Sequence, residues 1–583
     1  MNMQKKALCS KWSMYVFSGA LCAGIITGCF SAFFFHAYAQ SDTIEIAFDN
    51  NANTVPLPKI FSPNIDLSGR GFHQNVSWPQ GMAAPEVLDF WQKDVGFSGM
   101  FRVQFNMWEI HELARQSKTQ EALMAHYEEE IKRINDNGGI ALVSIFGTPA
   151  GLGKVLDRRS PPFDEKAFKE LLKVYIRRLS CEKRFTVWYE LWSAPDLDNF
   201  FVGRTQEYLV MYRAFAKAVQ ELEDDYKIHI PIGGPSTSWW FQKIDGNTVI
   251  TPERSLIYEL IRTSYHYRLP LDFITWHAYS TDPKVELDTT LYHKSSVALI
   301  RDWLTYFHFD RATPVIIDEW NFDSGLNVLA ERAERSYVTA SYIPSRLKRM
   351  SEAGVDYAVY YALEDFQANA DGVVQNVGVF SFDPALSAYK GAPKATYNVF
   401  RMLGMLLGGK VVFPARNQEE FLQYLVTKKG EESAVLIANY IDPDIVNNYL
   451  SRSIATLSEG SRRILVNLIR SRTMTQIMKR ELTIQQVRPL SRSVRNLLIR
   501  ALALHDQAQR YMQEDRAVTI TIRNIHDTLS MKRYVVDSSC AAGCNFVPLE
   551  EEDVAPQAIY KKEFLVKPYS VQLLVFQKKS VAE

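Results

Sequence analysis

The feature that most restricts the fold is a repeated alternation of short apolar stretches with amphipathic ones between residues 59 and 408. Short apolar runs predict buried strands, and the segments between them have the period of helices. The predicted strands are Ile60–Ile65, Gly99–Phe105, Ile140–Phe146, Thr186–Trp192, Ile228–Gly233, Asp272–Trp276, Val315–Asp318 and Asp356–Tyr361. The predicted helices include Thr119–Asn137, Asp164–Leu179, Thr205–Asp224, Ser255–Tyr267, Ser295–Phe307 and Val338–Ala353.

Eight strands separated by helices predict an α/β fold in which a closed (β/α)8 TIM barrel occupies residues 59–408. The alternative is a doubly wound open sheet, which usually carries a glycine-rich phosphate loop after its first strand. No such loop follows Ile60–Ile65, so the sequence favours the barrel.

The pattern changes after residue 408, where apolar and polar residues alternate with the period of strands. The strands Glu420–Val426, Ser433–Tyr440, Val518–Asn524 and Val571–Phe576 predict a C-terminal β-sandwich domain over residues 409–583. We expect a strand at Thr43–Phe48, within residues 40–58, to join this sandwich.

A helical insertion rich in arginine interrupts the predicted sandwich at about residues 450–512. One interpretation is a solvated helical hairpin packed on the sandwich. The other is a positive face that binds an anionic glycan or a membrane surface. Its arginines include Arg462, Arg463, Arg470, Arg472, Arg480, Arg488, Arg492, Arg495 and Arg500.

The N-terminal segment, residues 1–39, is typical of an exported protein. Three lysines precede an uncharged run at residues 12–35, and Ala37-Tyr38-Ala39 offers the small residues that signal peptidase needs. The run is also long enough to associate with a membrane as an uncleaved anchor. A third reading is a lipoprotein signal at Ile26–Cys29. Each reading predicts a periplasmic or extracellular location.

Composition excludes some partners. The 66 basic residues balance the 66 acidic ones, so we expect no nucleic-acid partner. No metal-ligand cluster occurs, and we expect neither a metal nor a cofactor. Cys181 is expected to be a buried thiol, and Cys540 and Cys544 to form a small disulfide loop in an oxidising compartment.

Distinctive side chains occur at the ends of the predicted barrel strands, where the strands of a TIM barrel build the active site. Arg102 lies in the second strand, where an inward arginine would hold a carboxylate in its charged form. The motifs that end later strands are Trp192-Ser193-Ala194-Pro195, Gly233-Gly234-Pro235, Trp276-His277-Ala278-Tyr279, Asp318-Glu319-Trp320-Asn321 and Tyr360-Tyr361-Ala362-Leu363-Glu364-Asp365.

This ordered set of motifs resembles glycoside hydrolase family 39, which includes β-xylosidases and α-L-iduronidase. The resemblance covers residues 59 to 410 and continues through Gly378-Val379-Phe380 and Pro393-Lys394-Ala395-Thr396-Tyr397. It implies a retaining glycosidase that acts on oligo- or polysaccharide, with Glu319 as the nucleophile. His277 and Tyr279 match residues that contact the nucleophile and the sugar. We count Arg102, Trp192, Ser193, Trp320 and Tyr361 among the substrate-binding residues.

The sequence departs from the family at the residue that protonates the leaving group. The family's motif Trp-Asn-Glu-Pro reads Trp192-Ser193-Ala194-Pro195 here, so Ala194 replaces the acid/base glutamate. Retaining glycosidases need two carboxyl groups about 5 Å apart, and general acid catalysis is worth about 10²–10⁴ in rate.

Other acids could replace the missing proton donor. Asp196 and Glu364 are the candidates, with Glu109 and Asp365 as further ones. Glu190 lies too deep in its strand to act there, and we interpret it as a buried acid paired with Arg102.

Two functions therefore remain open. The first is an extracytoplasmic glycosidase with a displaced proton donor. The second is a non-catalytic carbohydrate-binding or scaffold protein of exopolysaccharide or cell-envelope glycan metabolism. Ala194 favours the second, whereas Glu319, Tyr279 and His277 favour the first. The sequence identifies neither the sugar nor the linkage.

Overall fold

The computed structural model describes residues 44–69, 79, 81–114, 119–244, 251–287, 294–322, 336–367, 374–381, 392–412, 420–430, 432–454, 456–487, 490–540 and 545–579. The predicted leader and Cys544 lie outside these residues. Within them, no helix combines the length and apolar character that a membrane span requires. Cys181 is a buried free thiol, and Cys540 is disulfide-bonded.

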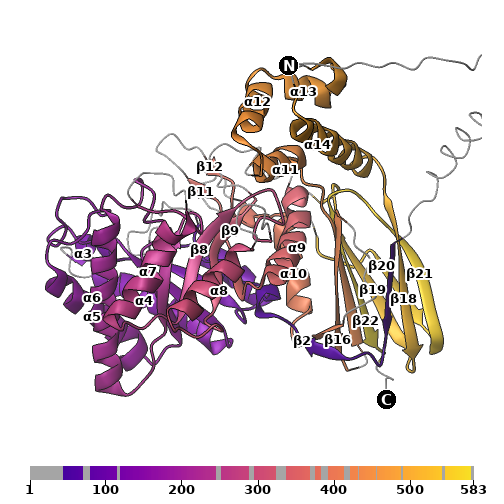
Figure 1. Cartoon of the computed structure of the whole chain (residues 1–583). Coiled ribbons are helices and arrows are strands. Elements are labelled where there is room, and N and C mark those ends of the chain that lie inside the picture. The colour runs from indigo at the N-terminus through magenta and orange to yellow at the C-terminus, as the bar shows by residue number, and fades with distance from the viewer. Residues whose placement is uncertain are drawn as a thin grey trace, which may run out of the picture.

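Eight parallel strands close into a barrel in the order β10-β3-β4-β5-β6-β7-β8-β9, so the predicted fold class is confirmed (Figure 1). The strands are β3 (Ile65–Asp66), β4 (Met100–Asn106), β5 (Ile140–Phe146), β6 (Val187–Leu191), β7 (Ile232–Thr237), β8 (Phe273–Tyr279), β9 (Val315–Asn321) and β10 (Tyr357–Tyr360). The helices of this part are α2 (Pro85–Asp94), α3 (Met107–Ala114), α4 (Thr119–Asp136), α5 (Glu165–Ile176), α6 (Thr205–Tyr226), α7 (Leu256–Tyr267), α8 (Ser296–Tyr306), α9 (Ser336–Ala353) and α10 (Ala395–Met405).

Two predicted strands are displaced along the chain. Lys59–Phe61 forms a 3-10 helix instead of the first half of strand Ile60–Ile65. Pro63 follows it and lacks the N–H that a strand ladder needs, so β3 begins only at Ile65. Pro231 likewise delays β7, which then runs through the Gly-Gly-Pro motif to Thr237.

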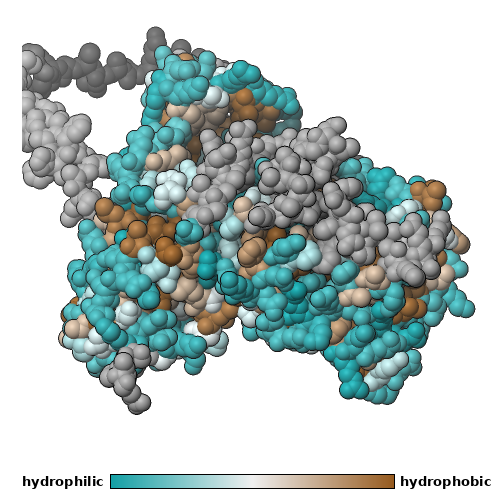
Figure 2. Space-filling model, turned by 180° about the vertical axis from the view of Figure 1, so that it is seen from behind, coloured by the Kyte–Doolittle hydropathy of each residue, from teal (hydrophilic) through white to brown (hydrophobic). Residues whose placement is uncertain are grey.

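Two sheets face each other in the C-terminal part and enclose a separate apolar core. One sheet consists of β1 (Ile44–Asp49), β18 (Arg516–Ile525) and β21 (Gln557–Val566), and β1 pairs in parallel with β18. The other has the order β2 (Thr54–Pro56), β15 (Lys410–Val412), β16 (Leu422–Lys429), β17 (Glu432–Asn439), β22 (Ser570–Lys578), β19 (Leu529–Val536) and β20 (Glu550–Val554). Figure 2 shows this sandwich and the barrel as two neighbouring lobes.

Four helices inserted between β17 and β18 form a third unit, which we call the helical unit. They are α11 (Ile445–Ile454), α12 (Glu459–Arg470), α13 (Thr473–Met478) and α14 (Arg492–Tyr511). The unit encloses its own apolar core, to which Leu465, Ile477 and Leu498 contribute. In Figure 1 it stands above the end of the barrel at which β11 (Phe366–Gln367) and β12 (Val374–Gln375) lie.

The helical unit is attached to the loop that follows β8. The Asn448 side chain of α11 donates to the Thr281 hydroxyl at 3.0 Å, and Arg452 pairs with Asp282. Arg346 of α9 donates to the Asp282 carbonyl at 2.5 Å and pairs with Glu286, and both of these side chains are almost completely buried. Buried charges therefore hold this loop between the barrel and the helical unit.

The Glu286–Arg346 pair gives a prediction for stability. In Glu286→Ala the Arg346 guanidinium stays buried without its carboxylate, so the unfolding free energy should fall by about 3–5 kcal/mol in a urea titration. Glu352→Ala is the matched control, because Glu352 also pairs with an arginine of α9, Arg349, but is more exposed. That variant should lose less than about 1 kcal/mol. Equal losses in the two variants would contradict the role given to the buried pair.

Candidate active site

The barrel interior is built in layers, because alternate residues of each strand point inward. The lowest layer is an apolar plug of Met100, Leu142, Phe273, Ile316 and Val359. Two residues further along their strands come Arg102 above Met100, Ser144 above Leu142 and Asp318 above Ile316, all fully buried. A polar layer therefore lies directly on an apolar one.

Arg102 is the centre of the polar layer and contacts four carboxylates. Its Nε lies 2.7 Å from Glu190, and its Nη1 lies 2.8 Å from Glu319 and 3.4 Å from Asp66. Its Nη2 lies 3.3 Å from Asp318. The predicted pairing of Arg102 with Glu190 is confirmed. Because Arg102 occupies the centre of these acids, it takes the place that a cation would otherwise fill.

A β-bulge in β9 lets two consecutive acids reach Arg102. On β8, Trp276 pairs with Ile317 and the next residue, His277, pairs with Glu319, which leaves Asp318 as an extra residue in β9. A bulge of this kind redirects the side chains that follow it. Asp318 and Glu319 therefore both contact the guanidinium, although successive residues of a regular strand would point to opposite faces.

Glu319 is held at both of its oxygens. The Tyr279 hydroxyl donates to Oε1, and Arg102 donates to Oε2. The Nε2 atom of His277 lies 3.5 Å from Oε2. The Glu319 side chain remains 13% exposed, whereas those of the other acids around Arg102 are 0% exposed. Of the four, Glu319 is therefore the acid that a ligand at the carboxyl ends of the strands can reach.

Burial sets the charges around Glu319. It raises the pKa of Glu190, with Asp318 adding to the effect, and it also raises the pKa of Asp66. Burial alone would raise the pKa of Asp318 too, but Arg102 and His277 outweigh it and lower that pKa. Burial alone would lower the pKa of His277, and Glu319 and Asp318 reverse this and raise it.

Several predicted substrate-binding residues do not face a ligand. Trp320 was expected to bind sugar, but it is fully buried, and its ring packs against Tyr342 of α9 at 5.9 Å and Tyr360 at 5.1 Å. The bulge is the reason, since it turns Glu319 inward and the next side chain outward. Trp192 is also buried, and its Nε1 donates to the Phe200 carbonyl at 2.9 Å.

Two other predicted substrate-binding residues lie close to Glu319. The Ser193 hydroxyl accepts a hydrogen bond from Arg102 at 3.1 Å. Tyr361 is half-buried and stacks on Phe366 with ring centroids 5.5 Å apart. The Tyr361 N–H donates to the Trp320 carbonyl at 2.9 Å, which places Tyr361 beside the end of β9 that carries Glu319.

Of the candidate proton donors, Glu364 and Asp365 are used within the fold. The Glu364 carboxylate accepts from the Ala84 N–H at 2.9 Å and is fully buried. Asp365 is buried and pairs with Lys394 at 2.7 Å. Glu109 is also buried. A leaving group outside the barrel would not reach Glu364, so the prediction that it replaces the acid is wrong.

Asp196 remains as a candidate. It is partly buried and accepts from the Ser238 N–H at 2.8 Å and from the Ser238 hydroxyl. Burial raises its pKa, which hydrogen bonds from Ser238 and the charge of His277 partly oppose. Asp196 follows β6 and its partner Ser238 follows β7, so Asp196 lies at the same end of the barrel as Glu319.

The backbone around Ala194 is strained. Trp192 has φ 73° and Ala194 has φ 45°, both in the left-handed region that side chains with a Cβ rarely adopt. The Ala194 N–H donates to the Ser236 carbonyl at 2.8 Å, which ties this loop to β7. Such conformations cost about 1–3 kcal/mol each and cluster at active sites.

Sequence reasoning missed two residues of the site. Asp66 at the end of β3 contacts Arg102, and its position after the apolar Ile65 was the available signal. The Ser236 hydroxyl lies 2.9 Å from Arg102 and 2.5 Å from Asp318. Ser236 directly follows the Gly-Gly-Pro motif, which the sequence had singled out without its neighbour.

A barrel that presents a carboxylate at the end of its seventh strand, held by an arginine and a tyrosine, has the architecture of a glycoside hydrolase. Residues 153–479 match the model of the glycosyl hydrolases family 39. This matched segment is more than half of the chain. The chain therefore belongs to this family.

Individual relatives agree with the assignment. The chain is 22% identical to a beta-xylosidase of Caldicellulosiruptor saccharolyticus over 285 residues, 47% of this chain and 52% of that protein. The chain thus matches about half the length of this relative.

Solved structures share the fold. A glucosidase from Croceicoccus marinus superposes with a TM-score of 0.60 at 15% identity, covering 93% of this chain and 100% of the other. The GH39 enzyme of Xanthomonas axonopodis pv. citri superposes with a TM-score of 0.58 at 14% sequence identity, and the match covers 94% of this chain and 99% of that chain. A monomeric beta-xylosidase from Caulobacter crescentus superposes with a TM-score of 0.58 at 14% sequence identity, and the match covers 92% of this chain and 100% of that chain.

The raised pKa of Glu190 predicts a pH-dependent stability. The folded protein holds a proton on Glu190 that the unfolded chain releases, so the free energy of unfolding should fall as the pH rises from about 4.5 to about 8. Glu190→Gln keeps an oxygen for Arg102 and removes the titration. In this variant, the decrease in the free energy of unfolding over the same pH range should be smaller by more than about 1 kcal/mol than in the unaltered protein. Urea unfolding at a series of pH values measures this difference.

The exposed residue Glu129 provides the control, since Glu129→Gln should lose stability in parallel with the unaltered protein. A Glu190→Gln variant with an unchanged pH profile would show that Glu190 is ionised throughout.

Proposed function

We propose that this protein is a retaining glycosidase that acts on oligo- or polysaccharide, with Glu319 as its nucleophile. The observation that carries the proposal is the setting of Glu319, which Tyr279 and Arg102 hold while its side chain keeps 13% exposure. A nucleophile needs this combination of a fixed position and access. A groove that only bound sugar would not require it.

In the proposed reaction, the residues around Glu319 hold its carboxylate in position for attack. The Arg102 guanidinium fixes the carboxylate against rotation, and Tyr279 orients the second oxygen. When the Glu319 oxygen attacks the anomeric carbon, its negative charge is lost to the new ester bond. Arg102 remains paired with the other three acids, so it does not become an isolated buried charge.

Asp196 would supply the proton that Ala194 cannot. As the C–O bond to the leaving group breaks, the departing oxygen takes the proton of the Asp196 carboxyl group. Water then attacks the glycosyl ester of Glu319, and the Asp196 carboxylate accepts the proton from this water. The position of Asp196 two residues after Ala194 and its raised pKa support this role, because a general acid must be protonated near the working pH.

Ala194 supports a second function, in which the protein binds carbohydrate without cleaving it. The family's proton donor is absent at the position where the motif places it.

For either function we propose an exported protein, periplasmic or extracellular. The lysines before the uncharged run at residues 12–35 and the small residues after it support export, whether by a cleaved signal or as an anchor.

Covalent trapping tests the nucleophile. A 2-fluoro glycosyl fluoride carries a leaving group that needs no proton, so it should label Glu319 even if proton donation is weak. Intact-mass spectrometry followed by peptide mapping should place one sugar on Glu319. Glu319→Gln should remain unlabelled. Absence of any adduct across xylosyl, glucosyl and uronyl probes would leave the binding function as the better account.

Leaving-group dependence tests the proton donor. Asp196→Asn should slow hydrolysis of unactivated glycosides by about 10²–10⁴, and should change hydrolysis of nitrophenyl glycosides much less. The control is Asp198→Asn, since Asp198 is exposed in the same loop. Ala194→Glu should raise the rate on unactivated glycosides. If Asp196→Asn affects both substrate types equally, Asp196 is not the acid.

A further inference from the structure

We infer that the helical unit binds an anionic polysaccharide chain along a row of arginines beside the catalytic end of the barrel. The inference rests on the proposed carbohydrate function for the identity of the polymer. It adds the charge of the substrate and the surface that recognises it. The row consists of Arg463 and Arg470 of α12 and Arg492 and Arg495 of α14, and we call it the arginine row.

The charge of the helical unit contrasts with that of the rest of the protein. Residues 445–512 contain twelve arginines and lysines and only three acids. Since the whole chain carries 66 of each, the remainder has 54 basic and 63 acidic residues. The helical unit therefore has an excess of basic residues, whereas the rest of the chain has an excess of acidic ones. This excess of positive charge attracts anions to the unit.

The arginine row is available to a ligand. Arg463 is 77% exposed and pairs with Glu459 of its own helix, which is equally exposed. Arg470, Arg492 and Arg495 are exposed and have no ion pair within the part of the chain that the structure describes. In Figure 2 the rim of the helical unit is hydrophilic, and apolar residues are visible between its helices.

Hydrogen bonds hold the starts of α12 and α14 together. The Ser461 hydroxyl in the first turn of α12 lies 2.9 Å from that of Ser491 and 3.1 Å from that of Ser493, at the start of α14. The two helices therefore begin side by side, with Arg492 and Arg495 at the start of α14. Arg463 and Arg470 are seven residues apart, which places them on one face of α12 two turns from each other.

Two of these charges do not stabilise the helix that carries them. Arg492 and Arg495 occupy the first turn of α14, which contains no acid, although the positive end of the helix dipole favours acids there. These two arginines are therefore unfavourable for the helix itself. Arginine is suited to bidentate binding of carboxylate or sulfate groups, and all four members of the row are arginine.

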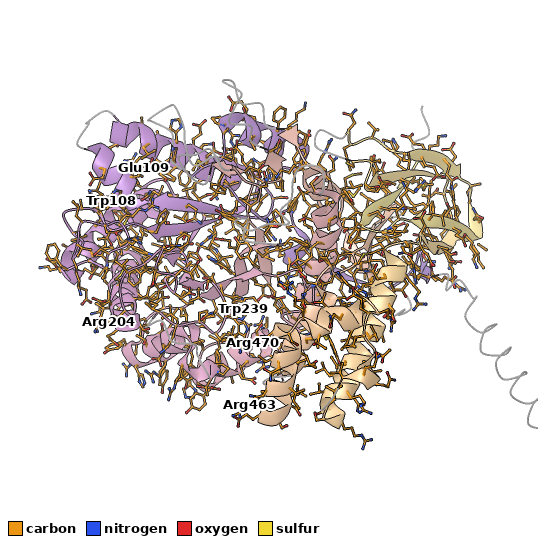
Figure 3. The ribbon with its side chains drawn as sticks, turned by 90° about the horizontal axis from the view of Figure 1, so that it is seen from above. Trp108, Glu109, Arg204, Trp239, Arg463 and Arg470 are labelled. Atoms are coloured by element: carbon orange, nitrogen blue, oxygen red, sulfur yellow. The ribbon has the colours of Figure 1, made fainter. Side chains whose placement is uncertain are left out.

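The row leads toward the catalytic end of the barrel. Figure 3, seen from above, shows Arg470 closer than Arg463 to Trp239, which follows β7. The helical unit is joined to Thr281 and Asp282, immediately beyond the strand that carries Tyr279. A polymer long enough to lie along the row could therefore reach Glu319. This continuity favours a polysaccharide over a membrane surface.

Binding measurements with the whole chain test the inference. All proteins carry Glu319→Gln, so that no turnover occurs and the outcome does not depend on catalysis. The probe is polygalacturonate, a carboxylated polysaccharide, with neutral dextran as the comparison. Replacing Arg463, Arg470, Arg492 and Arg495 by glutamine should weaken binding to polygalacturonate by about tenfold or more at low salt. Added salt should weaken binding of the parent protein.

The matched control replaces four exposed cations at the opposite end of the barrel, Lys93, Arg184, Lys227 and Arg268, which precede β4, β6, β7 and β8. This variant should bind as the parent does. Thermal unfolding of the row variant should be unchanged or slightly raised, which excludes misfolding as the cause of lost binding.

Three results would overturn the inference. The first is an equal loss of polygalacturonate binding in the row and control variants. The second is tighter binding to dextran than to polygalacturonate. The third is binding to vesicles of equal parts phosphatidylcholine and phosphatidylglycerol that is at least as tight as binding to polygalacturonate and that depends on the same arginines. The last result would identify a membrane surface instead. Failure of covalent trapping with intact polygalacturonate binding would remove only the catalytic proposal.

Discussion

The active-site half of this molecule depends on one buried arginine. Arg102 is fully enclosed in the barrel and faces Glu190, Asp66, Asp318 and Glu319. A buried charge is tolerated only when it is paired and hydrogen-bonded. The surrounding strands meet this demand by supplying acids and serines at the same height of the barrel. The position of the accessible acid, Glu319, is therefore a consequence of satisfying Arg102.

The two sides of the candidate site differ. On one side, Arg102 and Tyr279 fix the Glu319 carboxylate. On the opposite side, Trp192 and Ala194 retain left-handed backbone conformations, although the side chain at position 194 is only a methyl group. Strain of this kind persists only where the surrounding structure enforces it. The proposal that Asp196 donates the proton rests on its position two residues beyond Ala194 in this strained loop.

Much of this arrangement follows from the sequence because strand ends are local features. Apolar runs fix the order of the eight strands, and the inward position of Arg102 follows from its place in β4. The bulge in β9 does not follow, because it depends on pairing with β8 and β10, and nothing in Val-Ile-Ile-Asp-Glu-Trp marks the extra residue. For this reason Trp320 was expected to face sugar although it packs on α9. The burial of Glu364 was equally hidden, since its partner Ala84 lies 280 residues away.

The manner in which the helical unit is attached has a further consequence. Its two ends continue into β17 and β18 of the sandwich, Ala508 of α14 packs with Phe421 and Ile441, and α11 is fastened to the loop after β8. Three separate attachments prevent rotation of the unit about any single hinge. These attachments hold the helical unit against both the sandwich and the loop after β8. If the helical unit binds a polysaccharide that Glu319 cleaves, as proposed, these attachments would fix the length of the fragment that is released.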